Sequence, residues 1–298
     1  MELTPQVLAQ VSKSLNGVFA RALESKPKLY EQVALQVQAG TMTVEYRWLA
    51  TLPSMREWTG ERTLKSIEGY GYTITKKNWE STIKVDRDII KYDSLGIVGA
   101  QVAGMADLII DHYNAMVFGL FNTNSTCYDG VEFFHEQHPI SNNKTASNKG
   151  SHNLDQQGLL ESRMAMMCYQ NEDGRPLNIV PNLLLIPPSL ESAAMQLLKA
   201  PTLQNGAANI CYNLMEYLVC PYLNDNRWIL LDTSKTIKPI ILQTNKPVEF
   251  SALDQPTNQN NFMRREFLYG IDSEDNAGYG LWQLAYLNQI TKQSKEAK

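Results

Sequence analysis

The sequence has few charged residues for its length. Of its 298 residues, 43% are hydrophobic, which is enough for a sizeable core in one large domain or two modest ones. Only 19% are charged, against roughly 25% in an average soluble domain. The formal net charge of −4 makes the chain a poor candidate for a protein that binds nucleic acid by general electrostatic attraction. The composition also excludes collagen-like, coiled-coil and wholly disordered chains.

Long apolar runs and a secretion signal are also missing. No stretch reaches the ~18 consecutive apolar residues of a membrane-spanning helix, and the most apolar segment, 95–121, carries Asp107, Asp111 and His112. The first residues lack the basic and apolar stretches of a signal peptide. The four cysteines form no C-x-x-C pair, so we expect free, mostly buried thiols. We therefore expect a protein that is made in a cytoplasm and does not enter a membrane.

Common catalytic signatures are absent as well. The sequence contains no G-x-x-x-x-G-K phosphate loop and no G-x-S-x-G nucleophile motif. Gly69 and Gly71 lack the third glycine and the following helix of a dinucleotide-binding fingerprint. We interpret His112 as a helix histidine with satisfied hydrogen bonds rather than as a catalytic base. No cofactor and no catalytic residue are expected.

The best candidate for a metal site combines Cys127 with His135 and His138. The two histidines are separated by three positions, whereas the four-residue spacing of H-E-x-x-H places both ligands on one helical face. Pro139 also argues against a helix here. Cysteine and histidine are zinc ligands, so a cluster could still form if the chain folds back. We favour polar loop or interface contacts, and we keep a metal-dependent enzyme using these residues as a remote alternative.

Helical periodicity predicts a long strut. Apolar residues at three- and four-residue spacings predict helices over 4–24, with Thr4 as the N-cap, and over 93–121, with Asp93 or Ser94 as the N-cap. At 1.5 Å per residue the second helix would be roughly 43 Å long. A structural subunit has more use for such a helix than a compact enzyme.

A smaller helical region is predicted in the second half. We expect a helix over 153–171, with the methionines at 164, 166 and 167 filling the core. A buried strand over 182–186 then stops at two prolines, and Ser189 is the expected N-cap of the next helix.

Alternating apolar residues predict several strands, so the expected class is α+β. The strand segments are 30–50, 54–85, 215–220, 228–231, 238–242 and 262–286. The last pattern is broken near 272–276. The segment 54–85 has turn glycines and many charges but few aliphatic residues, and a hairpin of this kind cannot bury a face by itself. We interpret it as an extended arm whose partner lies outside its own domain, in a subunit that binds copies of itself.

Motifs in a fixed order give the sequence a family resemblance. They are Leu-Pro-x-Met-Arg-Glu-Trp-x-Gly within 48–62, Cys127-Tyr128-Asp129-Gly130, the proline-bounded stretch 181–191, and Gly278-Tyr279-Gly280-Leu281-Trp282. In these motifs the sequence resembles the major head subunit of Mu-like phages and prophages, the T protein family. The resemblance runs through most of the chain.

This resemblance implies the Hong Kong 97-type capsid fold. The implied segments are an N-arm (1–50), an extended E-loop hairpin (51–92), a peripheral domain (93–176) with a spine helix (93–121), an axial domain (177–245), and a peripheral return strand with the C-terminal tail (246–298). We expect inter-subunit contacts on the E-loop. The candidate residues are Arg56, Glu57, Trp58, Glu61, Arg62, Lys65, Lys76, Lys77 and Trp79.

The function implied by the resemblance is that of a major capsid protein. The family assembles as hexamers and pentamers of an icosahedral shell around double-stranded DNA, without sequence-specific DNA binding, in the host cytoplasm. The implied partners are further copies of the chain, a separate scaffolding protein, a portal and decoration proteins. An encapsulin-like nanocompartment shell, with a groove for cargo peptides, is the alternative within the same fold. The resemblance brings no catalytic residue.

Overall fold

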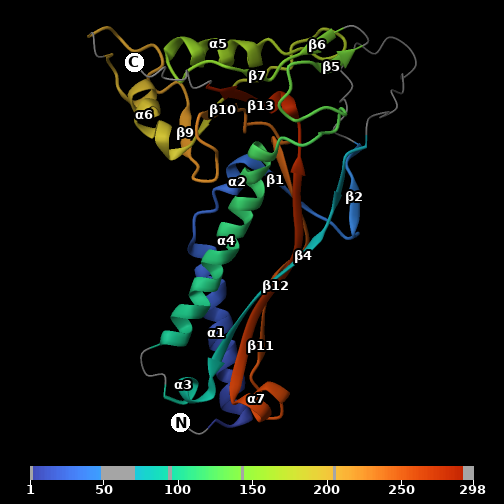
Figure 1. Ribbon diagram of the computed structural model, residues 1–298, viewed down its shortest axis with the longest axis vertical. Helices are drawn as coiled ribbons and strands as arrows, with labels where there is room; N and C mark the ends of the chain where they lie inside the picture. The colour runs from blue at the N-terminus through green and yellow to red at the C-terminus, as the bar shows by residue number, and fades with distance from the viewer. Residues whose placement is uncertain (1–2, 48–70, 93–95, 142–143, 204–205, 291–298) are drawn as a thin grey trace, which may run out of the picture.

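The molecule is elongated, with a mixed α/β unit at one end of a long body (Figure 1). The computed structural model describes residues 3–47, 71–92, 96–141, 144–203 and 206–290. In the long body two helices run beside strands that are shared between distant parts of the sequence, whereas the end unit contains the second sheet.

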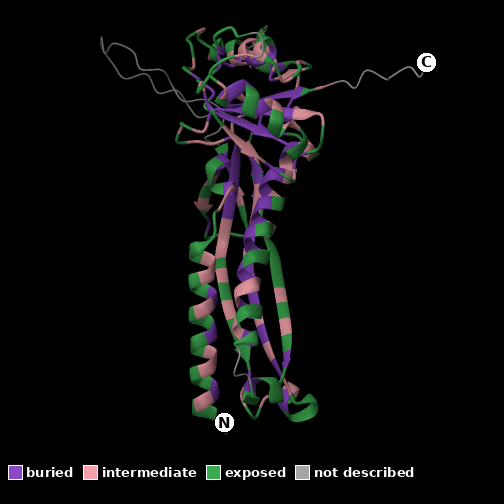
Figure 2. Ribbon diagram, turned by 90° about the vertical axis from the view of Figure 1, so that its left-hand side faces the viewer, coloured by how far each residue is buried: buried purple, intermediate pink, exposed green. Residues whose placement is uncertain are grey.

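The first helix, α1 (Pro5–Ser25), confirms the prediction over 4–24. The Val7 amide donates to Oγ1 of Thr4, the predicted N-cap, at 3.3 Å. The helix buries Leu8, Leu15 and Phe19 along one stripe, and it packs against α4. The remaining faces are partly or fully exposed in Figure 2.

The long helix, α4 (Ile97–Thr123), confirms the predicted strut, but its N-cap differs from the expectation. The cap is Gly96, in the left-handed region at φ 70°, with no side-chain capping bond. Because glycine has no Cβ, it adopts this conformation at little cost; the expected caps at 93 and 94 lie outside the described residues. No helix in the described ranges is long and apolar enough to cross a membrane.

A four-stranded sheet forms the spine of the long body. Its strands, in spatial order, are β1 (Ala34–Gln38), β11 (Ile240–Leu253), β12 (Glu266–Tyr279) and β4 (Lys77–Asp86). β1 is parallel to β11, and the other pairs are antiparallel. The central strand, β12, alternates buried and partly buried residues along most of its length and packs against α4.

Two strand predictions are corrected by this sheet. The break expected near 272–276 is wrong: β12 continues through it, because polar Ser273 and Asp275 are buried within the strand. The irregularity lies instead in β11, whose register shifts between Thr244 and Glu249. The second correction concerns the arm, for which we expected a partner outside its own domain, in a subunit that binds copies of itself. One strand of the arm, β4, instead pairs with β12 of the same chain. The remainder of the arm, 48–70, lies outside the described residues.

Short elements complete the body. They are α2 (Tyr30–Val33), β2 (Thr43–Glu45), β3 (Thr73–Thr75), α3 (Arg87–Tyr92) and α7 (Gln259–Arg264). β2 and β3 form a separate antiparallel pair. The segment 30–50 is therefore not extended throughout, because it begins with a helical turn that buries Tyr30 and Val33.

The end unit contains a five-stranded sheet. Its strands, in spatial order, are β7 (Lys149–Gly150), β13 (Ala285–Gln289), β10 (Arg227–Leu231), β8 (Leu183–Ile186) and β9 (Glu216–Val219). Beside it lie α5 (Gln156–Met167), the short hairpin of β5 (His138–Ser141) and β6 (Lys144–Ala146), the 3₁₀ turns η2 (Pro188–Leu190) and η3 (Trp282–Leu284), and α6 (Glu191–Lys199). Every residue of β8 is buried, which confirms the predicted buried strand.

Details of two helices differ from the predictions. In α5 Met166 is fully buried, whereas Met164 and Met167 are 61% and 41% exposed, because the helix buries only a narrow stripe. Ser189 is not the N-cap of α6: it lies in η2, and its hydroxyl donates to Asp225 Oδ1 at 2.7 Å. The thiols follow the prediction of free, mostly buried cysteines, with Cys168 exposed.

Candidate functional site

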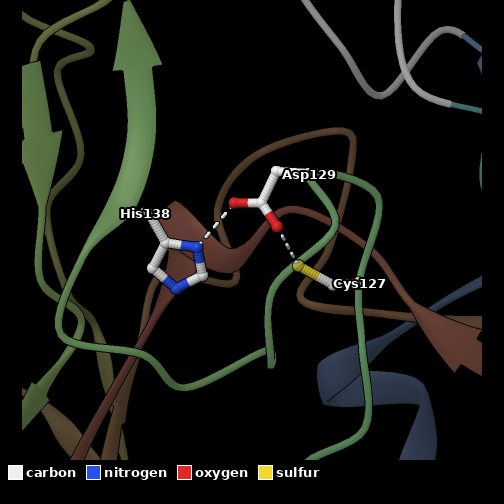
Figure 3. Close-up of side chains that lie close together, drawn as sticks. All are labelled: Cys127, Asp129 and His138. Atoms are coloured by element: carbon white, nitrogen blue, oxygen red, sulfur yellow. Dashed lines mark hydrogen bonds and ion pairs between the residues drawn. The ribbon is translucent and has the colours of Figure 1, made fainter. Parts of the chain in front are cut away.

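A buried cluster is formed by Cys127 and Asp129, in the segment that follows α4, and by His138, at the start of β5 (Figure 3). A tight turn after α4 brings the first two residues together. The Gly130 amide donates to the Cys127 carbonyl at 3.2 Å, and the Cys127 amide donates to the Val131 carbonyl at 2.8 Å. Gly130 has φ 86°, a conformation that favours glycine. The turn therefore depends on a glycine between the cluster and Val131.

The cluster is held by short contacts to one carboxylate. The Cys127 thiol donates to Asp129 Oδ1 at 2.9 Å, and His138 Nδ1 lies 2.6 Å from Asp129 Oδ2. Figure 3 shows the thiol and the imidazole approaching the two oxygens of the carboxylate from different sides. All three side chains are buried, so these contacts are shielded from water.

Asn148 fixes the orientation of the His138 ring. The Asn148 amide group donates to the carbonyls of Phe133 and Trp282, at 2.7 and 3.4 Å. Its Oδ1 is therefore the atom that faces His138 Nε2, at 3.0 Å, and we assign a hydrogen to Nε2 on this basis. The imidazole also stacks on the Trp282 indole, with ring centroids 4.0 Å apart and planes at 9°. Nδ1 is thus directed at Asp129.

Burial and hydrogen bonding set the protonation of the cluster. Burial raises the pKa of the Cys127 thiol well above its ordinary value, and its hydrogen bond to Asp129 raises this pKa further. Burial acts to raise the pKa of Asp129, but the hydrogen bonds from His138 and Cys127 outweigh it, and the pKa is lowered. In the cluster the carboxylate is therefore the charged acceptor, and the thiol is neutral.

The observed cluster differs from the set expected from sequence. Cys127 and His138, two members of the metal set that was kept as a remote alternative, lie together, but Asp129 rather than His135 takes the third position. The His135 imidazole accepts from the Gln137 amide at 3.0 Å and lines an open pocket on the surface. Sequence reasoning missed Asp129 and Asn148. For Asp129 the sequence did contain a signal, because this residue lies two positions after Cys127 and directly before Gly130.

The expected contact residues of the arm are only partly described. Arg56, Glu57, Trp58, Glu61, Arg62 and Lys65 lie outside the described residues. Lys77 is exposed, whereas the Lys76 ammonium pairs with Glu274 of β12.

Trp79, the last of the arm candidates, joins β4 to the interior of the body. Its indole Nε1 donates to the Asp275 carbonyl at 3.2 Å, and its ring centroid lies 4.4 Å from that of His112. The expectation of a satisfied His112 is wrong, since its Nε2 has no hydrogen-bond partner among the described residues. The Lys76 and Trp79 contacts described here hold β4 within its own chain.

Comparison with known proteins connects this architecture to phage heads. The sequence profile of the family described as Mu-like prophage major head subunit gpT matches residues 8–157, 149–223 and 224–297. The chain is 25% identical over 289 residues to the Mu-like prophage FluMu major head subunit of Haemophilus influenzae, covering 95% of this chain and 73% of that protein. It is 27% identical over 287 residues to the major capsid protein of Escherichia phage Mu, covering 96% and 74%.

Solved structures lead to the same fold. The structure matches a chain of the bacteriophage JBD30 procapsid with a TM-score of 0.66 and 26% identity, covering 98% of this chain and 78% of that one. A virus-like particle from Pyrococcus furiosus shares the fold at 8% identity, with a TM-score of 0.54, covering 93% of this chain and 98% of that one. With the profile matching nearly the whole sequence, the chain belongs to the Mu-like prophage major head subunit gpT family, the major capsid proteins of Mu-like phages with the α+β Hong Kong 97-type fold.

Proposed function

We propose that this major capsid protein assembles into hexamers and pentamers of an icosahedral shell that encloses double-stranded DNA. Self-assembly into a shell follows from the capsid homologues. Beyond self-assembly, we propose three features. The copies form hexamers and pentamers, the shell encloses double-stranded DNA, and assembly takes place in the cytoplasm of a bacterial host. Support comes from the elongated body, which exposes long faces that a single subunit leaves uncovered (Figure 2).

The observation that carries the proposal is the apolar end of the long body. Where β11 and β12 join through α7, Phe262 is 82% exposed, Met263 68% and Leu253 48%. Exposed apolar groups of this kind mark protein contacts, because leaving them in water is unfavourable. A neighbouring copy of the chain is the partner that a shell supplies. β4 offers a second contact, since it is an edge strand of the four-stranded sheet.

The proposal includes a division of the chain into capsid segments. They are the N-arm (1–50), the E-loop (51–92), the peripheral domain (93–176), the axial domain (177–245) and the peripheral return strand with the tail (246–298). β1 and β4, from the two arms, both join the sheet of β11 and β12. β8, β9 and β10 form the axial part of the second sheet, and β7 and β13 connect it to the flanking segments.

Further partners are proposed by analogy and by charge. The capsid of bacteriophage JBD30 is decorated with minor capsid protein trimers, and a chain of that capsid is 26% identical to this one, with a TM-score of 0.56 and coverage of 69% and 93%. We expect decoration, scaffolding and portal proteins here too. The net charge of −4 suits a container that encloses DNA without binding it tightly.

The test is negative-stain electron microscopy of the purified protein, alone and co-expressed with its neighbouring genes. Closed shells, hexamers or pentamers are expected, and the shell diameter separates a phage head from a small nanocompartment. A uniform monomer or dimer under both conditions would contradict the proposal. Nuclease-protected double-stranded DNA in shells produced during infection or prophage induction tests the proposed content.

A further inference from the structure

We propose that Cys127, Asp129 and His138 form a zinc-binding site in this capsid subunit. One ligand atom from each residue lies within 4.8 Å of the other two, and all three residues are buried. The site would tie the turn after α4 to β5 and, through the stacked indole of Trp282, to η3. This inference goes beyond the capsid role and is independent of it.

The donor set fits zinc in both chemistry and charge. A thiolate, a carboxylate and an imidazole nitrogen are all zinc ligands. When zinc binds, Zn–S, Zn–O and Zn–N bonds form, and two protons leave to solvent: the thiol proton, and the proton that bridges Asp129 and His138. The thiolate and the carboxylate then neutralise the two charges of the ion. The buried cluster therefore has no net charge before or after the exchange, which avoids the cost of an unpaired buried charge.

The surroundings of His138 are those of a metal ligand. The Asn148 carbonyl oxygen accepts the Nε2 hydrogen at 3.0 Å, so loss of the proton shared with Asp129 frees the Nδ1 lone pair on the side of Asp129 and Cys127. A second hydrogen bond of this kind commonly orients a metal-bound imidazole. Asn148 is itself held by two backbone carbonyls, so the ring is positioned before an ion arrives.

Only a small movement is needed to admit the ion. Tetrahedral zinc separates its ligand atoms by roughly 3.3–3.6 Å, given Zn–N and Zn–O bonds of about 2.0–2.1 Å and Zn–S bonds of about 2.3 Å. The Asp129 oxygens now lie 2.6 Å from His138 Nδ1 and 2.9 Å from Cys127 Sγ. A retreat of the carboxylate by about 1 Å or less would provide its separations from Nδ1 and Sγ, and these two atoms lie within 4.8 Å of each other.

An open surface pocket is lined by residues adjacent in sequence to the cluster. Thr126, Gly130 and Gln137 line it, and each is the sequence neighbour of one of the three ligands. Three protein ligands leave a fourth position, which a water molecule takes in zinc sites of this kind. The same three side chains also satisfy one another without an ion, so the experiment must separate a zinc site from a hydrogen-bonded cluster.

The experiment measures metal bound to the purified full-length subunit. The protein is stripped with a chelator, incubated with zinc, desalted and analysed by elemental mass spectrometry. The expected result is about one zinc ion per chain, lost in Cys127→Ser and His138→Asn. Matched controls are Cys220→Ser, a buried thiol outside the cluster, and His135→Asn, the neighbouring imidazole, and both should retain the ion.

Cobalt gives a second readout, and its measurement on the wild-type chain does not depend on a variant folding. Co²⁺ added to the stripped wild-type chain should produce a thiolate-to-cobalt charge-transfer band, which Cys220→Ser keeps and Cys127→Ser loses. Less than about 0.1 zinc per wild-type chain together with no cobalt band would overturn the proposal. Shells that form without zinc would leave the capsid role intact, so the two proposals fail separately.

Discussion

His112 on α4 and Asp275 on β12 face each other, with Nε2 and Oδ1 3.7 Å apart. Neither atom has a hydrogen-bond partner among the described residues. The other carboxylate oxygen of Asp275 accepts from the Tyr113 hydroxyl at 2.9 Å, and its backbone carbonyl accepts from the Trp79 indole. One buried residue thus connects α4, β4 and β12, the three elements that run along the body.

Asp275→Ala should destabilise the isolated subunit by about 1–3 kcal/mol, because it removes the carboxylate that accepts from the buried Tyr113 hydroxyl. Urea unfolding monitored by circular dichroism measures the change. Asp272→Ala, on the same strand, is the matched control: its carboxylate pairs with Lys246 at the surface, so the expected loss is below about 1 kcal/mol. Equal losses in the two variants would show that the contact with Tyr113 is not stabilising.

Gly280→Ala should destabilise the fold because there is no room for a side chain. A Cβ at this position would lie 2.1 Å from the Lys238 carbonyl oxygen, which is backbone and cannot rotate away. We expect a loss of about 1–3 kcal/mol or more in thermal or urea unfolding. Gly104→Ala, on α4, meets nothing within 4 Å and should instead gain up to about 1 kcal/mol from helix propensity. The prediction fails if both substitutions change stability in the same direction.

Buried tyrosines should make the subunit sensitive to alkali. Burial raises the pKa of Tyr30, Tyr46 and Tyr279 to about 12. Because the unfolded chain has tyrosine pKa values near 10, it loses these protons first as pH rises. The stabilisation is therefore complete below about pH 10 and is lost between about pH 10 and 12.

Parallel records of tyrosinate absorbance and circular dichroism across the alkaline range check this expectation. Part of the tyrosinate signal should rise only as the secondary structure is lost. If all the tyrosines titrate near pH 10 in a chain that is still folded, the burial of these three hydroxyl groups has been misjudged.

Phe262→Ser should impair shell assembly without unfolding the subunit. The side chain is 82% exposed, so its loss changes little within one chain. Its burial against a neighbour would contribute about 1.5–3 kcal/mol, so the protein concentration needed for assembly should rise by roughly tenfold or more. Light scattering and electron microscopy give the assembled fraction, and Phe262→Leu, which keeps an apolar contact, should assemble more readily. Unchanged assembly of Phe262→Ser would exclude this end of the body as an interface.

The fold could be predicted best where one continuous hydrophobic pattern decides the structure. The stripes of α1 and α4 and the run of four apolar residues in β8 are visible in sequence alone. The continuity of β12 was not, because Asp275 resembles a turn residue until Tyr113 is placed beside it. The exposure of Met164 was missed for a related reason, since hydrophobicity does not show how wide a helix face the neighbouring elements cover.

The candidate cluster was half predictable. Cys127 and His138 were chosen for their ligand chemistry, and His135 was chosen for its proximity in sequence. The geometry selects Asp129 instead, because the turn at Gly130 directs it towards His138. Asn148 comes from beyond the β5–β6 hairpin, and only the folded chain brings it to the imidazole.

Because β4 pairs with β12, which is synthesised much later, this part of the sheet can form only late in synthesis. Asp86 pairs with Glu266 and Lys77 with Asp275, so β4 leaves the ribosome long before its partner exists. At about 5–20 residues per second, the delay is on the order of 10–40 s. During this interval a charged strand with few aliphatic residues is less prone to aggregate than an apolar one. Proteolysis of ribosome-bound chains stalled before and after β12 should cleave the β4 region only in the shorter ones. The sparse hydrophobicity of β4 thus suits a strand that must wait in solution during synthesis.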